Sequence, residues 1–246
     1  MDRDPISALA AEEERLEEIL SGLDAVEWDK GSACAGWSVR DVVLHLAQTE
    51  EAVVASLGGG AFAAPASADV STIDDLMAAW VDAERDSSGD AFARWQTARR
   101  DALDGLRAAP ADQVVQWAAA PLKPLTLATT RLSEHWIHAL DISEPLGRDL
   151  PDSDRLWHIA RLAQRTLPYA YARAGRSDAP SVYVELDPPD GGDPWTFGEP
   201  GAQVTIAGRA GEFCRVAARR LPAAGASLVA SGPGADEVLD LIRTYA

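Results

Sequence analysis

The sequence has few cysteines and no long apolar segment. Cys34 and Cys214 are the only cysteines among 246 residues, which excludes a disulfide framework and a zinc site built from cysteine alone. No apolar run reaches the roughly 18 residues that cross a bilayer. The N-terminal segment turns acidic where a signal peptide would be apolar. These absences predict a cytoplasmic protein without a membrane segment.

Positive charge is scarce as well. Lys and Arg together number 22 and Asp and Glu 39, so the formal net charge is −17. A protein that binds nucleic acid needs a basic face for the phosphates, and anionic membrane surfaces attract basic segments. We therefore expect neither nucleic acid nor a membrane as partner. Separately, we expect a small-molecule substrate, and a protein that is a monomer or homodimer.

Helical periodicity dominates the first part of the chain, up to about residue 145. Apolar residues recur at the spacing of an amphipathic helix, and Ser38 and Asp90 are suited to cap helices that begin beside them. A stretch of small residues at 58–68 and a proline-flanked segment at 118–126 interrupt the pattern. The predicted helices cover residues 6–20, 38 to beyond 53, 72–85, 90 to about 106, and 127–144.

The pattern changes in the last hundred residues. After a helix at 152–174, expected to bend or break near Pro168, apolar and polar residues alternate as in β-strands. The sequence predicts strands at 181–186, 195–199, 203–208 and 227–232, and helices at 209–220 and 234–246. The fold class is therefore α+β: a helical bundle at 1–148, then a linking helix and a small α+β domain at 149–246.

The chemistry-bearing residues concentrate on the helix predicted at 127–144. Glu134 and His138 are four positions apart and share one helical face, and Arg131 and Asp141 extend the same stripe. Because the rest of this helix is apolar, the ionisable stripe is costly unless its members are paired or bind something. His45, on the helix that starts at Ser38, is likewise an ionisable residue near an apolar face.

If these two helices face each other, His45, Glu134 and His138 converge. Two imidazoles and one carboxylate suit zinc or a similar divalent ion and leave a position open, and Asp141 or a backbone carbonyl would orient a ligating ring. The alternatives are a solvated Glu–His surface pair and a histidine satisfied within the core. His135 is a further candidate that replaces Glu134 or joins the set, unless it packs or caps.

Three other polar residues have simpler interpretations. Cys34 has two interpretations, a reactive thiol and an ordinary loop thiol. The ordinary thiol is predicted, because neither a helix N-terminus nor a basic neighbour stands behind Cys34 in the sequence. Cys214 is predicted in the core, between Phe213 and Val216. His158, on a charged helix, is predicted at the surface.

Two segments carry a resemblance to a known family. GWSVRDVVLHLAQTE (36–50) and TTRLSEHWIHALDI (129–142) are similar to the pattern of the mycothiol-dependent maleylpyruvate isomerase family, within the DinB-like metal-binding four-helix bundles. The stretch from SVYVELDPPDGG onward resembles the small C-terminal domain of an actinobacterial metal-binding branch. The resemblance implies one divalent metal, most often zinc, held in the bundle by His45, Glu134 and His138, and implies mycothiol as a thiol cofactor.

The resemblance also implies an activity, that of a metal-dependent isomerase or thiol S-transferase acting on a small unsaturated or electrophilic metabolite. A metal with an open position lowers the cost of deprotonating a thiol. Arg131 and Asp141 are then the catalytic candidates. Arg219 and Arg220, with Arg215, are candidates for binding the cofactor across an interdomain cleft, although at least two of these three are expected to be solvated.

Two other functions stay open at this point. One is a metal-dependent hydrolase, lyase or cyclase that needs no thiol, for example in the tailoring of a natural product. The other is a non-catalytic protein whose metal only holds the bundle together or is sensed. A structural metal site is closed and four-coordinate, whereas three protein ligands and an open position favour an enzyme.

Overall fold

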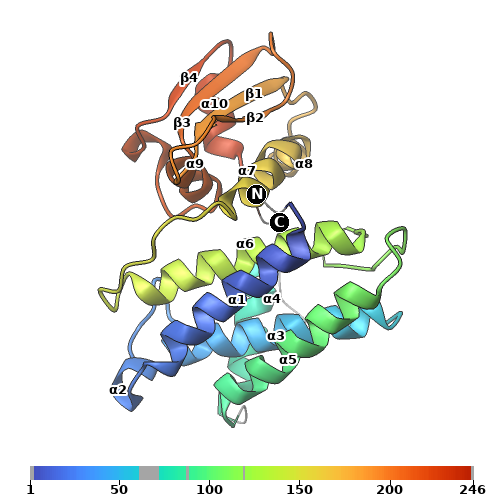
Figure 1. Cartoon of the computed structure of the whole chain (residues 1–246), viewed down its shortest axis with the longest axis vertical. Coiled ribbons are helices and arrows are strands. Elements are labelled where there is room, and N and C mark those ends of the chain that lie inside the picture. The colour runs from blue at the N-terminus through green and yellow to red at the C-terminus, as the bar shows by residue number, and fades with distance from the viewer. Residues whose placement is uncertain (1–2, 61–71, 87–88, 119, 245–246) are drawn as a thin grey trace. The chain divides into compact units, whose positions relative to one another are not determined.

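The computed structural model describes residues 3–60, 72–86, 89–118 and 120–244. The chain divides into two compact units, a helical unit at Asp4–Leu150 and a C-terminal unit at Pro151–Ala246 (Figure 1). The predicted loop at 58–68 lies mostly outside the described residues. None of the described helices is long and apolar enough to cross a membrane.

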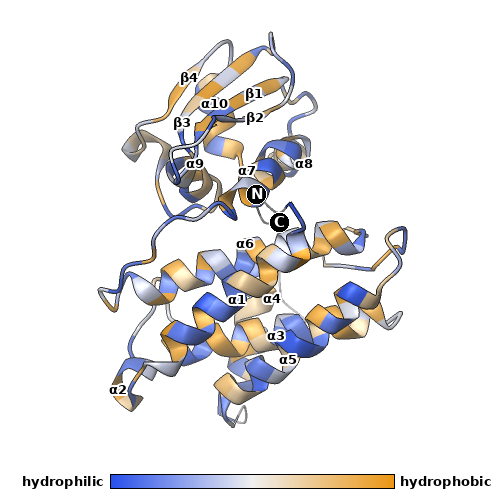
Figure 2. Ribbon diagram, viewed as in Figure 1, coloured by the Kyte–Doolittle hydropathy of each residue, from blue (hydrophilic) through white to orange (hydrophobic). Residues whose placement is uncertain are grey.

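The helical unit is built on long amphipathic helices. Hydrophilic and hydrophobic residues alternate along them (Figure 2), and α1 packs along α6 while α3 packs along α5. Ser38 and Asp41 form the capping box that starts α3. The helices are α1 (Pro5–Ser21), α2 (Ala25–Trp28), α3 (Val39–Leu57), α4 (Ile73–Glu84), α5 (Ala91–Ala108) and α6 (Pro124–Ser143).

Helix α6 starts earlier than the sequence predicted. Its first residue is Pro124, whereas the proline-flanked loop was expected to continue to residue 126. Proline is well suited to the first helical turn, because its fixed φ matches a helix and its missing N–H would have had no partner there. The longer helix presents Leu127 and Ala128 to the core as well.

The acidic run of α1 is partly buried. Such a run is typical of a solvated face, yet Glu12 and Glu13 are 1% and 0% exposed. Glu12 is paired with Arg15 at 2.6 Å, whereas Glu13 lies beside His135 of α6. Glu14 does lie on the exposed side.

The C-terminal unit combines a four-stranded mixed sheet with helices, so the predicted α+β class is confirmed. Strand order is β2-β1-β3-β4, with β1 parallel to β3 and both outer pairs antiparallel. The elements are α7 (Leu156–Arg165), α8 (Leu167–Arg173), β1 (Val182–Asp187), β2 (Trp195–Phe197), β3 (Val204–Arg209), α9 (Ala210–Ala217), η1 (Ala223–Gly225), β4 (Val229–Ser231) and α10 (Ala235–Leu241).

Local sequence features explain this unit's breaks and its core. The helix predicted at 152–174 breaks between α7 and α8, at Thr166, two residues before Pro168. This break is expected, because proline has no backbone N–H to donate within a helix. Cys214 is buried, which confirms its core position, and its thiol donates to the Leu156 carbonyl. His158 is only 5% exposed, so the surface prediction for this residue was wrong.

Candidate metal centre

Three side chains from two helices converge inside the helical unit. His45 lies on α3, and Glu134 and His138 lie on α6. The Nε2 atoms of His45 and His138 lie 3.7 and 3.6 Å from the same atom, Oε2 of Glu134. The two imidazole rings are 5.0 Å apart, edge to face. The structure therefore brings together the three residues that the sequence suggested as ligands.

The electrostatics of this trio suit cation binding. Burial lowers the pKa of His45 to about 4, so its ring is neutral and has a lone pair to donate at neutral pH. Burial alone would raise the pKa of Glu134, but the neighbouring rings of His138 and His45 outweigh it and hold that pKa well below its ordinary value. Glu134 is accordingly a carboxylate, and it draws two ring nitrogens toward one oxygen.

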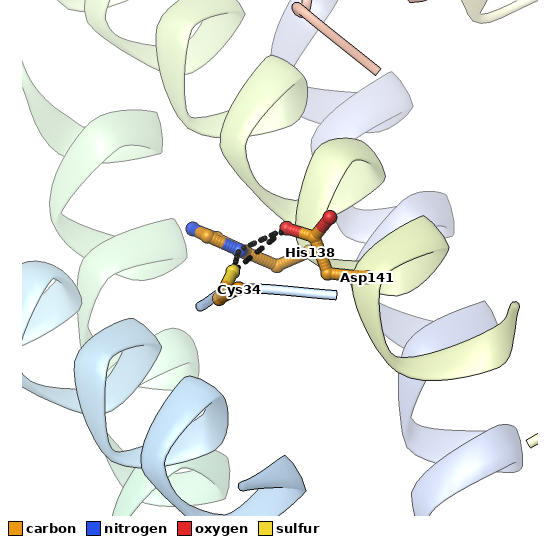
Figure 3. A group of neighbouring side chains, drawn as sticks. All are labelled: Cys34, His138 and Asp141. Atoms are coloured by element: carbon orange, nitrogen blue, oxygen red, sulfur yellow. Dashed lines mark hydrogen bonds and ion pairs between the residues drawn. The ribbon is translucent and has the colours of Figure 1, made fainter. Parts of the chain in front are cut away.

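The second nitrogen of His138 has a carboxylate partner. Nδ1 of His138 lies 3.0 Å from Oδ2 of Asp141, one helical turn further along α6 (Figure 3). This contact fixes the ring and leaves Nε2 directed at Glu134, as in the carboxylate–histidine–metal arrangement of many metalloproteins. Asp141, expected to orient a ligating ring, contacts the ring of the candidate ligand His138. Burial by itself would lower the pKa of His138, yet the bonds with Asp141, Cys34 and Glu134 raise it well above its ordinary value.

Cys34 belongs to this neighbourhood, which the sequence did not indicate. Its Sγ atom lies 3.1 Å from Oδ2 of Asp141 and 3.7 Å from Nδ1 of His138 (Figure 3). The prediction of an ordinary loop thiol was therefore wrong. The two partners are more than a hundred positions away in the chain, so no local pattern could have linked them.

A second buried group lies further along α6. His135, 0% exposed, bonds the Arg131 carbonyl through Nδ1 and accepts the indole N–H of Trp95 at Nε2, 3.2 Å away. Glu13 and Glu50 approach it at 3.6 and 3.7 Å. Both ring nitrogens are thus engaged, and His135 does not join the His45 site.

Arg131 is also buried, and it is hydrogen-bonded to other residues of the core. Its Nε donates to Oε1 of Glu50 at 2.7 Å and its Nη2 to Oγ1 of Thr49 at 2.8 Å, and the residue is only 2% exposed. Arg131, a catalytic candidate in the sequence, thus has Glu50, a carboxylate of the chain itself, as its partner.

The other two predicted arginines lie in the C-terminal unit. Arg219 donates to the backbone carbonyl of Asp240, and Arg220 to that of Ala218. Arg219 is exposed and adopts a positive φ of 61° at the end of α9. Arg215, in contrast, pairs with Asp152 at 2.8 Å.

The donor set fits a divalent ion. The three ligand atoms all lie within 4.8 Å of one another, each histidine offers Nε2, and the carboxylate supplies one negative charge. The side chain of Glu134 is 26% exposed, against 6% for His45 and 9% for His138, so Glu134 is the member of the trio that lies nearest to solvent. These features are typical of a site that keeps a position open for a further ligand.

Fold and site together define a class, that of helical bundles carrying a candidate His–Glu–His metal site in their interior. Within that class, the chain belongs to the family of the mycothiol maleylpyruvate isomerase N-terminal domain, whose pattern matches residues 9–143. The matched segment includes all three candidate ligands.

Relatives and solved structures agree with this assignment. The uncharacterized protein Rv0036c of Mycobacterium tuberculosis (strain ATCC 25618 / H37Rv) is 29% identical over 251 residues, covering 98% of this chain and 95% of that protein. The uncharacterized protein MT0041 of strain CDC 1551 / Oshkosh matches equally. The crystal structure of mycothiol-dependent maleylpyruvate isomerase superposes with a TM-score of 0.61 at 16% identity, over 92% of this chain and 91% of that one. A histidine-to-alanine variant of that enzyme gives 0.59. At this identity the likeness shows a shared fold.

Proposed function

We propose that this protein is a metal-dependent enzyme that uses a low-molecular-weight thiol, mycothiol, either to isomerise a small electrophilic metabolite or to transfer the thiol to its electrophilic carbon. The observation that carries the proposal is the convergence of His45 and His138 Nε2 atoms on one oxygen of Glu134. Zinc is the metal we expect, because imidazole and carboxylate donors in a three-ligand site suit it.

The charges of the donor set favour an anionic ligand from solution. A metal bound to His138 would displace the proton of that ring, and the two neutral imidazoles and one carboxylate would then leave one positive charge of a divalent ion uncompensated. A metal in such a site supplies Lewis acidity, which lowers the pKa of a thiol or water that enters the open position. The partial exposure of Glu134 provides the approach for that ligand.

The thiol in this proposal comes from outside the chain. Cys34 lies at the Nδ1 side of the His138 ring, whereas Nε2 on the opposite side faces Glu134. A single ion bound to Nε2 is therefore out of reach of the Cys34 sulfur. Cys214 is buried in the C-terminal unit. A soluble thiol is left as the sulfur nucleophile.

Cobalt substitution tests the proposal. The apo protein is loaded with Co²⁺ and titrated with mycothiol, or with a simple model thiol, while the absorption spectrum is recorded. We expect a sulfur-to-cobalt charge-transfer band in the wild type and none in His138→Ala. If cobalt binds but no band forms at millimolar thiol, a hydrolase, lyase or cyclase that activates water is the better account. If the bound cobalt is four-coordinate with protein ligands alone, a non-catalytic metal site is favoured.

A further inference from the structure

The loop between α2 and α3 is attached to the helix that carries two of the candidate ligands. The backbone N–H of Ala33 donates to the Asp141 carbonyl at 2.9 Å, and the Cys34 thiol donates to the Asp141 side chain at 3.1 Å. One residue of α6 thus accepts hydrogen bonds from two consecutive loop residues, through its backbone and its carboxylate.

The loop is held in shape by its own hydrogen bonds. Ser32 Oγ donates to the Trp37 carbonyl at 2.9 Å and accepts the Cys34 N–H at 3.1 Å. A tight turn follows, closed by the Trp37 N–H on the Cys34 carbonyl at 3.0 Å. Gly36 takes the positive φ of 79° that this turn requires. The position of the Cys34 sulfur is therefore set by the loop and not by side-chain freedom alone.

The thiol and the imidazole share one acceptor atom. Oδ2 of Asp141 receives the Cys34 S–H and also lies 3.0 Å from Nδ1 of His138 (Figure 3). Asp141 is 1% exposed, so water does not compete freely for that oxygen. A donor that holds Oδ2 in place also holds the orientation of the His138 ring, whose Nε2 faces Glu134.

His45 is supported differently. Its Nδ1 atom is buried and has no hydrogen-bond partner among the described residues, and its ring packs against Trp37 of the same loop, with centroids 5.2 Å apart. Orientation of the ring through a hydrogen bond at Nδ1 is thus confined to His138 in this pair. Removal of the Cys34 thiol would therefore affect the orientation of His138 and leave His45 unchanged.

We infer that Cys34 is a positioning residue, whose thiol holds Asp141 and through it orients His138 for metal binding. The inference rests on the proposed metal site and adds a residue to it. Outer partners of metal-bound histidines typically contribute about 10–100-fold in metal affinity. Cys34 acts through one further hydrogen bond, so its contribution is smaller, about fivefold, which is the weight of one ordinary hydrogen bond.

A double-mutant cycle on cobalt affinity tests this role. Wild type, Cys34→Ala, Asp141→Ala and the double variant are titrated with Co²⁺ against a chromophoric chelator, and the visible spectrum of each is recorded. We expect Cys34→Ala to weaken binding about fivefold and to change the cobalt spectrum. In the Asp141→Ala background the same substitution should have no further effect, because residues that act through one another are not additive.

Two more variants separate positioning from packing. Cys34→Ser restores a hydroxyl donor and should bind cobalt more tightly than Cys34→Ala, while Cys214→Ala, which removes the buried thiol of the other unit, should match the wild type. Thermal midpoints of the apo proteins show whether the loop variants are still folded.

The outcomes divide as follows. Unchanged cobalt affinity and spectrum in Cys34→Ala overturn the inference. It is also overturned if Cys34→Ala lowers the affinity equally in the wild-type and Asp141→Ala backgrounds, or if Cys34→Ser binds cobalt as weakly as Cys34→Ala. A sulfur-to-cobalt band in thiol-free wild type that vanishes in Cys34→Ala would make Cys34 a ligand and overturn it too. A wild type that binds no cobalt overturns the metal site itself, whereas normal wild-type binding with an inert Cys34→Ala overturns only the positioning role.

Discussion

The buried carboxylate of Glu13 gives a prediction that depends on the core and not on the metal. Glu13 is 0% exposed, and neither of its oxygens has a hydrogen-bond partner among the described residues. The neighbouring Glu50 is already paired with Arg131 at 2.7 Å. His135 offers Glu13 no proton, since its Nε2 accepts from an indole. The Arg131 guanidinium is thus paired with Glu50, and Glu13 is expected to be neutral.

The expected effect on stability follows from proton linkage. Burial, reinforced by the nearby charge of Glu50, raises the pKa of Glu13 well above its ordinary value. Between the unfolded-state pKa of about 4.3 and the higher folded-state pKa, only the folded chain keeps this proton. Wild-type stability therefore falls with rising pH by about 1.4 kcal/mol per pH unit from this group alone. Below about pH 4 the Glu13 side chain is protonated in both the folded and the unfolded chain, so the loss of stability is absent there.

The assay compares Glu13→Gln with the wild type by urea unfolding of the apo protein across about pH 4 to 8. Glutamine resembles the neutral acid and does not titrate, so the variant should become progressively more stable than wild type as pH rises. Glu14→Gln, at the neighbouring exposed position, is the matched control and should follow the wild type. Parallel wild-type and Glu13→Gln curves would refute the reasoning, because they would mean that Glu13 is ionised in the fold.

Two further predictions concern the C-terminal unit and the thiols. Gly198→Ala should destabilise strongly, since a Cβ there would lie 2.2 Å from the Val182 carbonyl oxygen at a φ of +86°. Gly201→Ala, with a φ of +84° and open space, should cost only about 1–2 kcal/mol of backbone strain in thermal unfolding, and equal losses would contradict this. Iodoacetamide should label the native chain once, on Cys34, because burial raises the pKa of the Cys214 thiol; peptide mass mapping that finds Cys214 labelled first would refute it.

The helices could be predicted from the sequence because they depend on the spacing of residues that are close together in the chain. The spacing of Val39, Val42 and Leu46 marks α3, and the four-residue interval between Glu134 and His138 places both on one face of α6. The convergence with His45 needed the packing of two helices, which spacing suggests but does not determine. The resemblance to a known family supplied that part.

Features that depend on tertiary contacts could not be predicted in the same way. Glu13 sits in an acidic run that is typical of a solvated face, and only its position opposite His135 buries it. Arg131 faces Glu50, a residue more than eighty positions away, so its commitment to the core has no local signature. Cys34 belongs to a loop whose placement is set by a bond to Asp141.

Metal content per folded chain tests the central claim most directly. Wild type, His45→Ala, Glu134→Gln and His138→Ala are purified, equilibrated with Zn²⁺, dialysed and analysed by mass spectrometry of the metal, with circular dichroism to confirm folding. His135→Gln is the matched control, because this neighbouring histidine lies in the other buried group. The account predicts one zinc per chain in the wild type and the control, and loss of it in the three ligand variants. Folded ligand variants that keep the wild-type zinc content would contradict it.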